Sequence, residues 1–170
     1  MTIERSGPAI DAGERAMLEG WLDYHRQTLA WKCQGLDDAQ LRTASASPSE
    51  LSLLGLVRHM ADVERSWFRK VLVGDDPGPI YYSDEDRDGE FHLTEEDTWE
   101  EAYGTWQREI EIARENAARF ALDDLSEGRS RFTDKPFNLR WIYTHMIEEY
   151  ARHNGHADLI RELIDGTTGD

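Results

Sequence analysis

Cysteine is almost absent from this sequence of 170 residues, which contains only Cys33. A single cysteine excludes an intrachain disulfide and any cysteine-rich metal site. Long apolar runs are also missing: residues 53–57 are among the longest, far short of the roughly 20 residues that cross a bilayer. The N-terminus lacks the basic-then-apolar pattern of a signal peptide. We therefore expect a soluble, cytoplasmic protein without a membrane partner, in which histidine and carboxylate side chains hold any metal.

Positive charge is scarce. The chain has 19 Lys and Arg against 35 Asp and Glu, which gives a net charge of -16. Such a surface repels a phosphate backbone, so we exclude nucleic acid as a partner. The imbalance is concentrated in residues 75–101, which hold twelve acidic residues but only one Lys or Arg, Arg87. We interpret residues 75–97 as an acidic loop.

The hydrophobic pattern indicates an all-α protein. With 39% hydrophobic residues, the chain can bury one sizeable core, so we expect a single domain over residues 1–170 with residues 1–10 as a short tail. Little of the sequence alternates with the period of two that is typical of half-buried strands, whereas four segments show helical spacing. The sequence therefore predicts a four-helix bundle, present as a monomer or a homodimer.

The four predicted helices cover residues 11–35, 52–74, 94–120 (beginning at Thr94 or Thr98) and 138–166. Asp11 with Glu14 forms a capping-box pattern for the first helix, and Ser52 and Asn138 are suitable N-caps for the second and fourth. The connections between helices 2 and 3 and between helices 3 and 4 are about 20 and about 17 residues long, whereas links in bundles usually have about 2–8 residues. Links of this length can cover a site.

Four residues with metal-binding side chains lie on one face of the last predicted helix. At about 100° per residue, His145, Glu149, His153 and His156 point in directions of about 0°, 40°, 80° and 20°. Apolar neighbours flank this direction, so the stripe faces the core or its rim. Buried imidazoles and carboxylates cost free energy unless they are paired or bound to metal. The pattern therefore favours a metal site.

The second predicted helix supplies a complementary ligand, His59, which lies on an inward-facing apolar stripe. Glu149 and His153 have the i, i+4 spacing that brings two ligands together on one helix. With His59 they form a set of two histidines and one carboxylate, which leaves coordination positions open, as in catalytic zinc or non-haem iron sites. A di-iron site is disfavoured because no helix carries the Glu-x-x-His pair.

Two other interpretations remain open. The histidines could be ordinary ones that pair with Glu149 or lie half exposed beside Asp158 and Glu162. Separately, Asp84 to Gly89, followed by Glu95, match the D-x-D-x-D-G-x5-E pattern of a calcium loop. Residues 77–82 contain two prolines where the incoming helix of such a site should lie. This favours a solvated acidic connector over a calcium site.

Several strings resemble the actinobacterial branch of the DinB-like superfamily: ERAMLEGWLDYHRQTLAWKCQGL, LSLLGLVRHMADVERSWF, DRDGEFH and EEYARHNGHADLIRELIDG. The resemblance covers nearly the whole chain. The superfamily includes mycothiol-dependent maleylpyruvate isomerase and the mycothiol and bacillithiol S-transferases. It implies a four-helix bundle with a divalent metal held by one residue of helix 2 and two residues, spaced by four, of the last helix.

Carried over residue by residue, the resemblance assigns the metal ligands to His59 in VRHMADVE and to Glu149 and His153 in EEYARHNGH. Glu at position 149 matches the isomerase and its relatives, where other members more often have His. His156 occupies a position where many members have Gln or His, so we expect it, with His145, to orient the ligands or to shuttle protons. Zinc is the favoured metal, with nickel or iron as alternatives.

The implied function is that of a divalent-metal-dependent transferase. It would activate a low-molecular-weight thiol, mycothiol by resemblance, for attack on an electrophilic small molecule lying across the open end of the bundle. The alternatives are a thiol-dependent isomerase and a non-catalytic bundle that binds a metal or ligand. Cys33, near the end of an amphipathic helix with no basic partner, is interpreted as a passive small hydrophobe.

Overall fold

The computed structural model describes residues 4–169. Its helices are α1 (Glu14–Cys33), α2 (Asp38–Arg42), α3 (Leu53–Glu64), the π-helix η1 (Arg65–Val71), α4 (Trp99–Ala117) and α5 (Leu139–Asp165). Within residues 4–169 there is no strand, only two isolated bridges between loop positions. The all-α prediction is confirmed.

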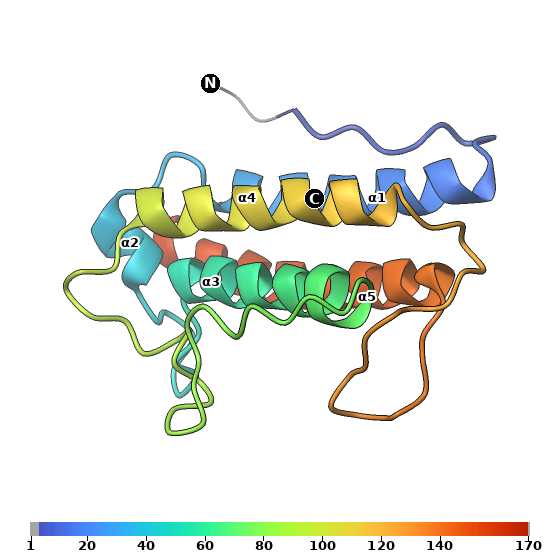
Figure 1. Ribbon diagram of the computed structural model, residues 1–170. Coiled ribbons are helices and arrows are strands. Elements are labelled where there is room, and N and C mark those ends of the chain that lie inside the picture. Colours follow the sequence, from blue (N-terminus) through green and yellow to red (C-terminus); the bar gives the residue numbers. More distant parts are fainter. Residues whose placement is uncertain (1–3, 170) are drawn as a thin grey trace.

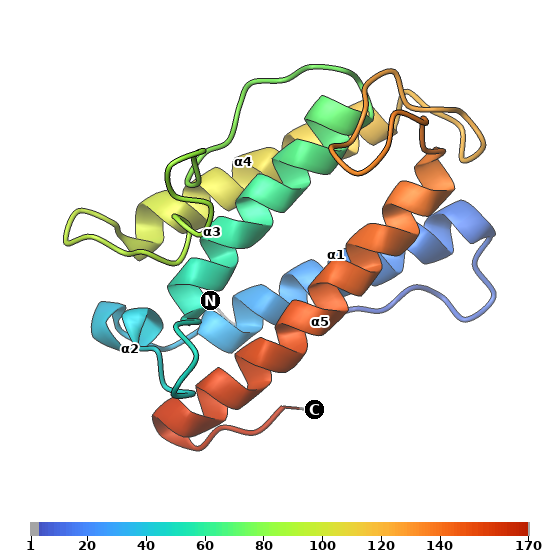
Figure 2. The same ribbon diagram turned by 90° about the horizontal axis from the view of Figure 1, so that it is seen from below.

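The helices form two layers. One layer contains α1 and α4, and the other contains α3, continued by η1, and α5 (Figure 1). Seen from below, onto the face of the layers, α3 and α5 lie side by side (Figure 2), while α1 packs chiefly against α5 and α4 against α3. This confirms the four-helix bundle and its long links.

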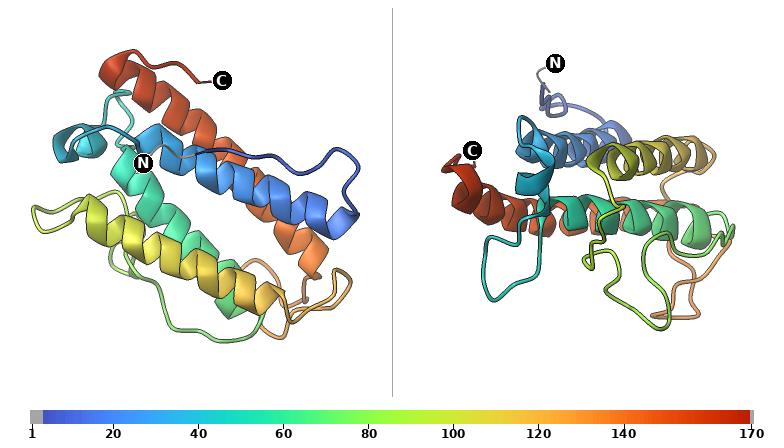
Figure 3. Two further views of the ribbon diagram at one scale, coloured as in Figure 1. Left: turned by 90° about the horizontal axis from the view of Figure 1, so that it is seen from above. Right: turned by 90° about the vertical axis from the view of Figure 1, so that its left-hand side faces the viewer.

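The two long links determine where a site can form. Residues 72–98 join η1 to α4, and residues 118–138 join α4 to α5. Both links extend beyond the outer face of the α3 and α5 layer, on the side away from α1 and α4 (Figure 3). The links therefore cover the flank of the bundle rather than its end.

A buried polar network joins the four long helices. Arg26 of α1 donates two hydrogen bonds, of 2.8 and 2.7 Å, to the carboxylate of Glu64 at the end of α3. The Tyr150 hydroxyl of α5 donates to the same carboxylate at 2.7 Å and accepts a hydrogen bond of 2.8 Å from Trp106 of α4. A buried ion pair is tolerated when further hydrogen bonds satisfy it, as Tyr150 does here. The network therefore fixes the helices relative to one another beside Glu149.

The N-caps of the later helices follow the sequence, but that of α1 does not. Ser52 and Asn138 accept hydrogen bonds from backbone N–H groups in the first turns of α3 and α5, as predicted. The predicted capping box of Asp11 with Glu14 is wrong. A turn closed by the Ala12 N–H and the Ala9 carbonyl precedes α1, so the helix begins at Glu14 with Gly13 as its N-cap.

The second predicted helix changes its winding after Glu64. Residues Arg65–Val71 form a π-helix, and the N–H of Leu72 donates to the carbonyl of Trp67, five residues earlier, at 2.9 Å. Such segments widen the helix locally and are frequent at functional sites. Here the widened segment carries Ser66, Trp67 and Lys70, which all line the cavity described below.

Gly128 holds the second link against the end of η1. Its N–H donates to the Val71 carbonyl at 2.9 Å, and a Cβ at this position would lie 2.0 Å from the Lys70 carbonyl oxygen. Because that neighbour is backbone, Gly128→Ala should lower the free energy of unfolding by roughly 1–3 kcal/mol. Thermal and urea unfolding measure the effect. Gly155→Ala, where a Cβ meets nothing within 4 Å, is the control and should not destabilise the protein. Equal melting temperatures for wild type and Gly128→Ala would contradict the prediction.

Candidate functional site

A cavity of about 670 Å³ lies between α3 with η1, on one side, and α5 on the other, beneath the two long links. The link of residues 72–98 contributes Tyr82, Glu90 and Phe91 to its wall, and the link of residues 118–138 contributes Arg131. This cavity does not lie at the open end of the bundle, where we expect the substrate from the sequence. The links fold back along the flank of the bundle, and the space they enclose is there.

The three predicted metal ligands meet in this cavity. One ligand atom from each of His59, Glu149 and His153 lies within 4.8 Å of the other two. The His59 and His153 ring centroids are 4.6 Å apart, and His153 Nε2 lies 3.5 Å from Glu149 Oε2. Ligands that sit about 2.0–2.2 Å from one ion must be this close to each other. We call these three residues the ligand trio.

A second group of metal-type side chains overlaps the ligand trio. It consists of His145, Glu148 and Glu149, all on α5. His145 Nε2 lies 3.5 Å from Glu149 Oε1, and its ring stacks on Trp141 with centroids 5.0 Å apart. The Glu148 side chain is 56% exposed, whereas no member of the ligand trio exceeds 23%. The trio is the better candidate because it is more buried and draws on two helices.

His156 lies behind the ligand trio. Its Nδ1 is 3.4 Å from His153 Nδ1, and the two rings meet edge to face with centroids 5.3 Å apart. His156 and His145 thus contact His153 and Glu149, respectively, and both line the cavity. Each is positioned to orient a ligand or to exchange a proton with a molecule in the cavity.

The shifted pKa values of Glu149 and His153 suit the binding of a cation. Partial burial opposes ionisation of Glu149, but hydrogen bonds to His153 and Arg152 and the charge of Arg152 prevail and lower its pKa to about 2. Burial lowers the pKa of His153, and it does the same for His145. The Glu149 carboxylate is therefore ionised at neutral pH, and the lowered pKa values of His153 and His145 favour their neutral imidazoles, as metal binding requires.

Glu90 is a site residue that the sequence did not reveal. The His59 Nδ1–H donates to Glu90 Oε1 at 2.9 Å, and the neighbouring Phe91 stacks on the His59 ring. In the sequence Glu90 looks like one more member of a solvated acidic connector, but its residue is only 6% exposed. The available signal was its apolar neighbour Phe91 within an otherwise acidic run.

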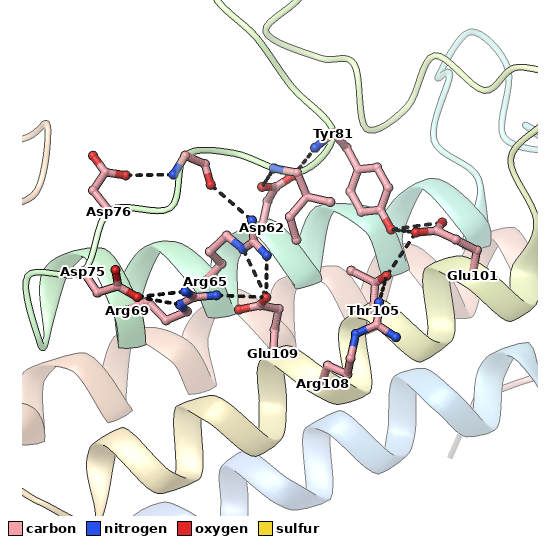
Figure 4. A network of polar contacts seen from close by, with 12 residues as sticks. Asp62, Arg65, Arg69, Asp75, Asp76, Tyr81, Glu101, Thr105, Arg108 and Glu109 are labelled. Carbon is pink, nitrogen blue, oxygen red and sulfur yellow. Dashed lines mark hydrogen bonds and ion pairs between the residues drawn. The ribbon is translucent and has the colours of Figure 1, made fainter.

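The first link is anchored to the helices on the cavity side. The Asp62 carboxylate accepts hydrogen bonds from the backbone N–H groups of Ile80 and Tyr81 at 2.7 and 3.0 Å (Figure 4). Arg65 donates to the Gly78 carbonyl at 3.4 Å and to Glu109 of α4 at 2.7 Å. These contacts hold the link as a wall of the cavity.

The structure does not gather the carboxylates of the calcium pattern. Within residues 4–169, the groups able to hold a metal include neither Asp84 nor Glu95, and Asp86 pairs with His92 at 2.8 Å. We expect calcium to leave the melting temperature nearly unchanged, because a ligand stabilises only when it binds the folded state. Thermal unfolding with and without calcium tests this. A large rise that Glu95→Gln abolishes would contradict it.

Cys33 lies outside the cavity at the end of α1 and is 2% exposed. Burial raises the pKa of its thiol to about 12, so the group is neutral and inert at physiological pH. Any thiol that reacts in the cavity must come from elsewhere.

The all-α bundle with a histidine and glutamate cluster between its second and last long helices has the architecture that the DinB-like resemblance implies. A model of the mycothiol-S-transferase family matches residues 17–166. The chain belongs to this family, a family of transferases within the DinB-like superfamily. No curated protein matches the sequence. None of the described helices is both long and apolar enough to cross a membrane.

Proposed function

We propose that this protein is a divalent-metal-dependent transferase that joins mycothiol to an electrophilic small molecule. The observation that supports the proposal is the ligand trio on the wall of a cavity of about 670 Å³. Cavities of this size are typical of small-molecule sites. Zinc is the favoured metal because two imidazole nitrogens and one carboxylate oxygen match its catalytic sites, while nickel and iron accept the same ligands.

The residues present fit a metal. His59 has its Nδ1–H engaged by Glu90, which leaves the Nε2 lone pair for coordination. The trio supplies three ligands and leaves open positions, as catalytic zinc sites require. When bound, a divalent ion lowers the pKa of a coordinating thiol and so supplies thiolate at neutral pH.

The side chains around the ligand trio can exchange protons with bound molecules and provide apolar surface for the electrophile. His156 contacts His153 through Nδ1 and lines the cavity, so it can orient His153 or exchange a proton with a bound molecule. His145 can do the same from the other side, next to Glu149. Trp67 and Phe91 provide apolar wall against which the electrophile can pack. We expect the reaction to occur in the cytoplasm, where small thiols are kept reduced.

The cosubstrate assignment follows from the family and from Cys33. Because that cysteine is buried away from the cavity, the nucleophilic sulfur must come with a small thiol. The family name indicates mycothiol as that thiol. An isomerase would use the same thiol but release it unchanged, so the products separate the two activities.

The proposal is tested by elemental analysis of the purified protein, followed by an assay of thiol consumption with a panel of electrophiles. We expect about one divalent ion per chain and consumption of mycothiol in preference to glutathione and cysteine. A protein that contains metal but consumes no thiol with any electrophile would instead support the non-catalytic binding bundle. Turnover without net thiol consumption would indicate the isomerase.

A further inference from the structure

The contact between Glu90 and His59 joins a loop to a predicted metal ligand. Glu90 Oε1 accepts the His59 Nδ1–H at 2.9 Å, across 31 residues of sequence. A carboxylate in this position fixes the tautomer of the imidazole and its orientation, and raises its basicity. Phe91 stacks on the same ring with centroids 5.6 Å apart and planes inclined by 27°. Two consecutive residues of the link thus hold the ring, one at its edge and one at its face.

Glu90 is buried at the wall of the cavity. The residue is 6% exposed, and its Oε2 is buried with no hydrogen-bond partner among the described residues. An ionised carboxylate with an unsatisfied oxygen costs free energy in such a place. A cation on the far side of His59 would offset that cost, because the imidazole would transmit its positive charge to the carboxylate.

We propose that Glu90 is a positioning residue for His59, and that it couples metal binding to the ordering of the link that covers the cavity. The proposal rests on the proposed function, since it takes the ligand trio as the metal site. Glu90 is not itself a member of the ligand trio. It acts through His59, by directing Nε2 toward Glu149 and His153.

The coupling should be local because the link has other anchors. Asp62 holds the backbone at Ile80 and Tyr81. At the other end, Arg58 pairs with Asp97 at 3.0 Å, and it also donates to the carbonyl of Gly89, next to Glu90, at 3.3 Å. The stretch between Tyr81 and Asp97 contacts the ligand trio through Glu90 and Phe91. Metal binding should therefore protect the backbone around residues 83–93 rather than the whole link.

The first experiment measures zinc affinity by competition with a chromogenic chelator. Glu90→Gln keeps the size and an acceptor but removes the charge, and Glu90→Ala removes both. We expect zinc to bind about tenfold more weakly to Glu90→Gln and up to about 100-fold more weakly to Glu90→Ala. The matched control is Glu96→Gln, an exposed residue of the same link, which should bind zinc like the wild type.

Two further readouts separate positioning from a merely structural role. The absorption spectrum of the cobalt-loaded protein should shift in Glu90→Ala, because the His59 ring can turn, and should be unchanged in Glu96→Gln. Zinc should slow hydrogen exchange of residues 83–93 in the wild type but not in Glu90→Ala. Melting curves of the metal-free variants establish that they are folded.

The outcomes distinguish this proposal from the function on which it rests. If the wild type binds zinc and Glu90→Ala matches it in affinity, spectrum and exchange, the role of Glu90 is overturned while the metal site stands. If the wild type binds no divalent metal, the proposed function falls and the coupling falls with it.

Discussion

His59→Ala and His153→Ala should each reduce the metal content of the purified protein from about one divalent ion per chain to less than about a tenth of that. Each substitution leaves only two protein ligands of the ligand trio, and catalytic zinc sites use three. The two residues come from different long helices, α3 and α5, so loss in both variants would show that the ion lies between them. Elemental analysis after dialysis against metal-free buffer measures the effect.

A matched histidine outside the trio provides the control. His92 lies in the same link as Glu90, with its side chain 51% exposed and paired with Asp86, so His92→Ala should keep the full metal content. Full retention of metal in both His59→Ala and His153→Ala would refute the assignment. Loss of metal in His145→Ala, with retention in His59→Ala, would move the ion to the second group on α5.

Glu149→Gln is expected to lower the rate of mycothiol conjugation by about two orders of magnitude, even when metal is resupplied. Glutamine keeps the size and a weak oxygen ligand but removes a negative charge from the site. Glu149 has a pKa of about 2, so the charge is fully present at neutral pH. Its loss also leaves Arg152 without that partner, which adds a repulsive positive charge next to the metal ligands. The loss of ligand charge and the loss of a hydrogen-bond partner should each lower the conjugation rate by about tenfold or more.

The assay is single-turnover conjugation of mycothiol to a reporter electrophile by metal-loaded protein, with glutathione and cysteine as comparison thiols. Cys33→Ser should conjugate mycothiol at the wild-type rate, because the nucleophile comes with the cosubstrate. Glu162→Gln, an exposed glutamate of α5, controls for the loss of charge on that helix. A chelator should stop the reaction. Equal rates in wild type, metal-free protein and Glu149→Gln would leave the binding bundle as the better interpretation.

Hydrophobic periodicity was sufficient to predict the four long helices, because burying one face of each helix is what holds the bundle together. Ser52 and Asn138 were correctly identified as caps, since the apolar pattern begins directly after them. Asp11 was not, because a preceding turn decides where α1 starts. The π-helix was also invisible, because seven residues of altered winding leave no readable change in the spacing of apolar residues.

In the site, too, features that arise within one helix could be predicted from residue spacing, whereas contacts between distant segments could not. The alignment of Glu149 and His153 follows from helix geometry alone, and so was predictable from spacing. His59 required the packing of α3 beside α5, for which the sequence offered an apolar stripe and a family resemblance. Glu90 lies in a segment without regular structure, 31 residues from its partner, so no periodicity could connect the two. The position of the cavity on the flank depends on the paths of the links, which short-range patterns do not encode.

The π-helix gives this fold one place where chain length can vary. The hydrogen bond from the Leu72 N–H to the Trp67 carbonyl spans five residues instead of four, so the π-helix accommodates one extra residue. The helical segments before and after it therefore keep the same faces buried. Deleting one residue elsewhere in α3 would instead turn everything beyond it by about 100°. Loss of one residue between Arg65 and Val71 would restore α-helical winding and leave both His59 and the buried Leu72 in place. Such a deletion would change the cavity wall around Ser66, Trp67 and Lys70, so substrate preference could diverge among proteins of this fold by insertion and deletion while the ligand trio is preserved.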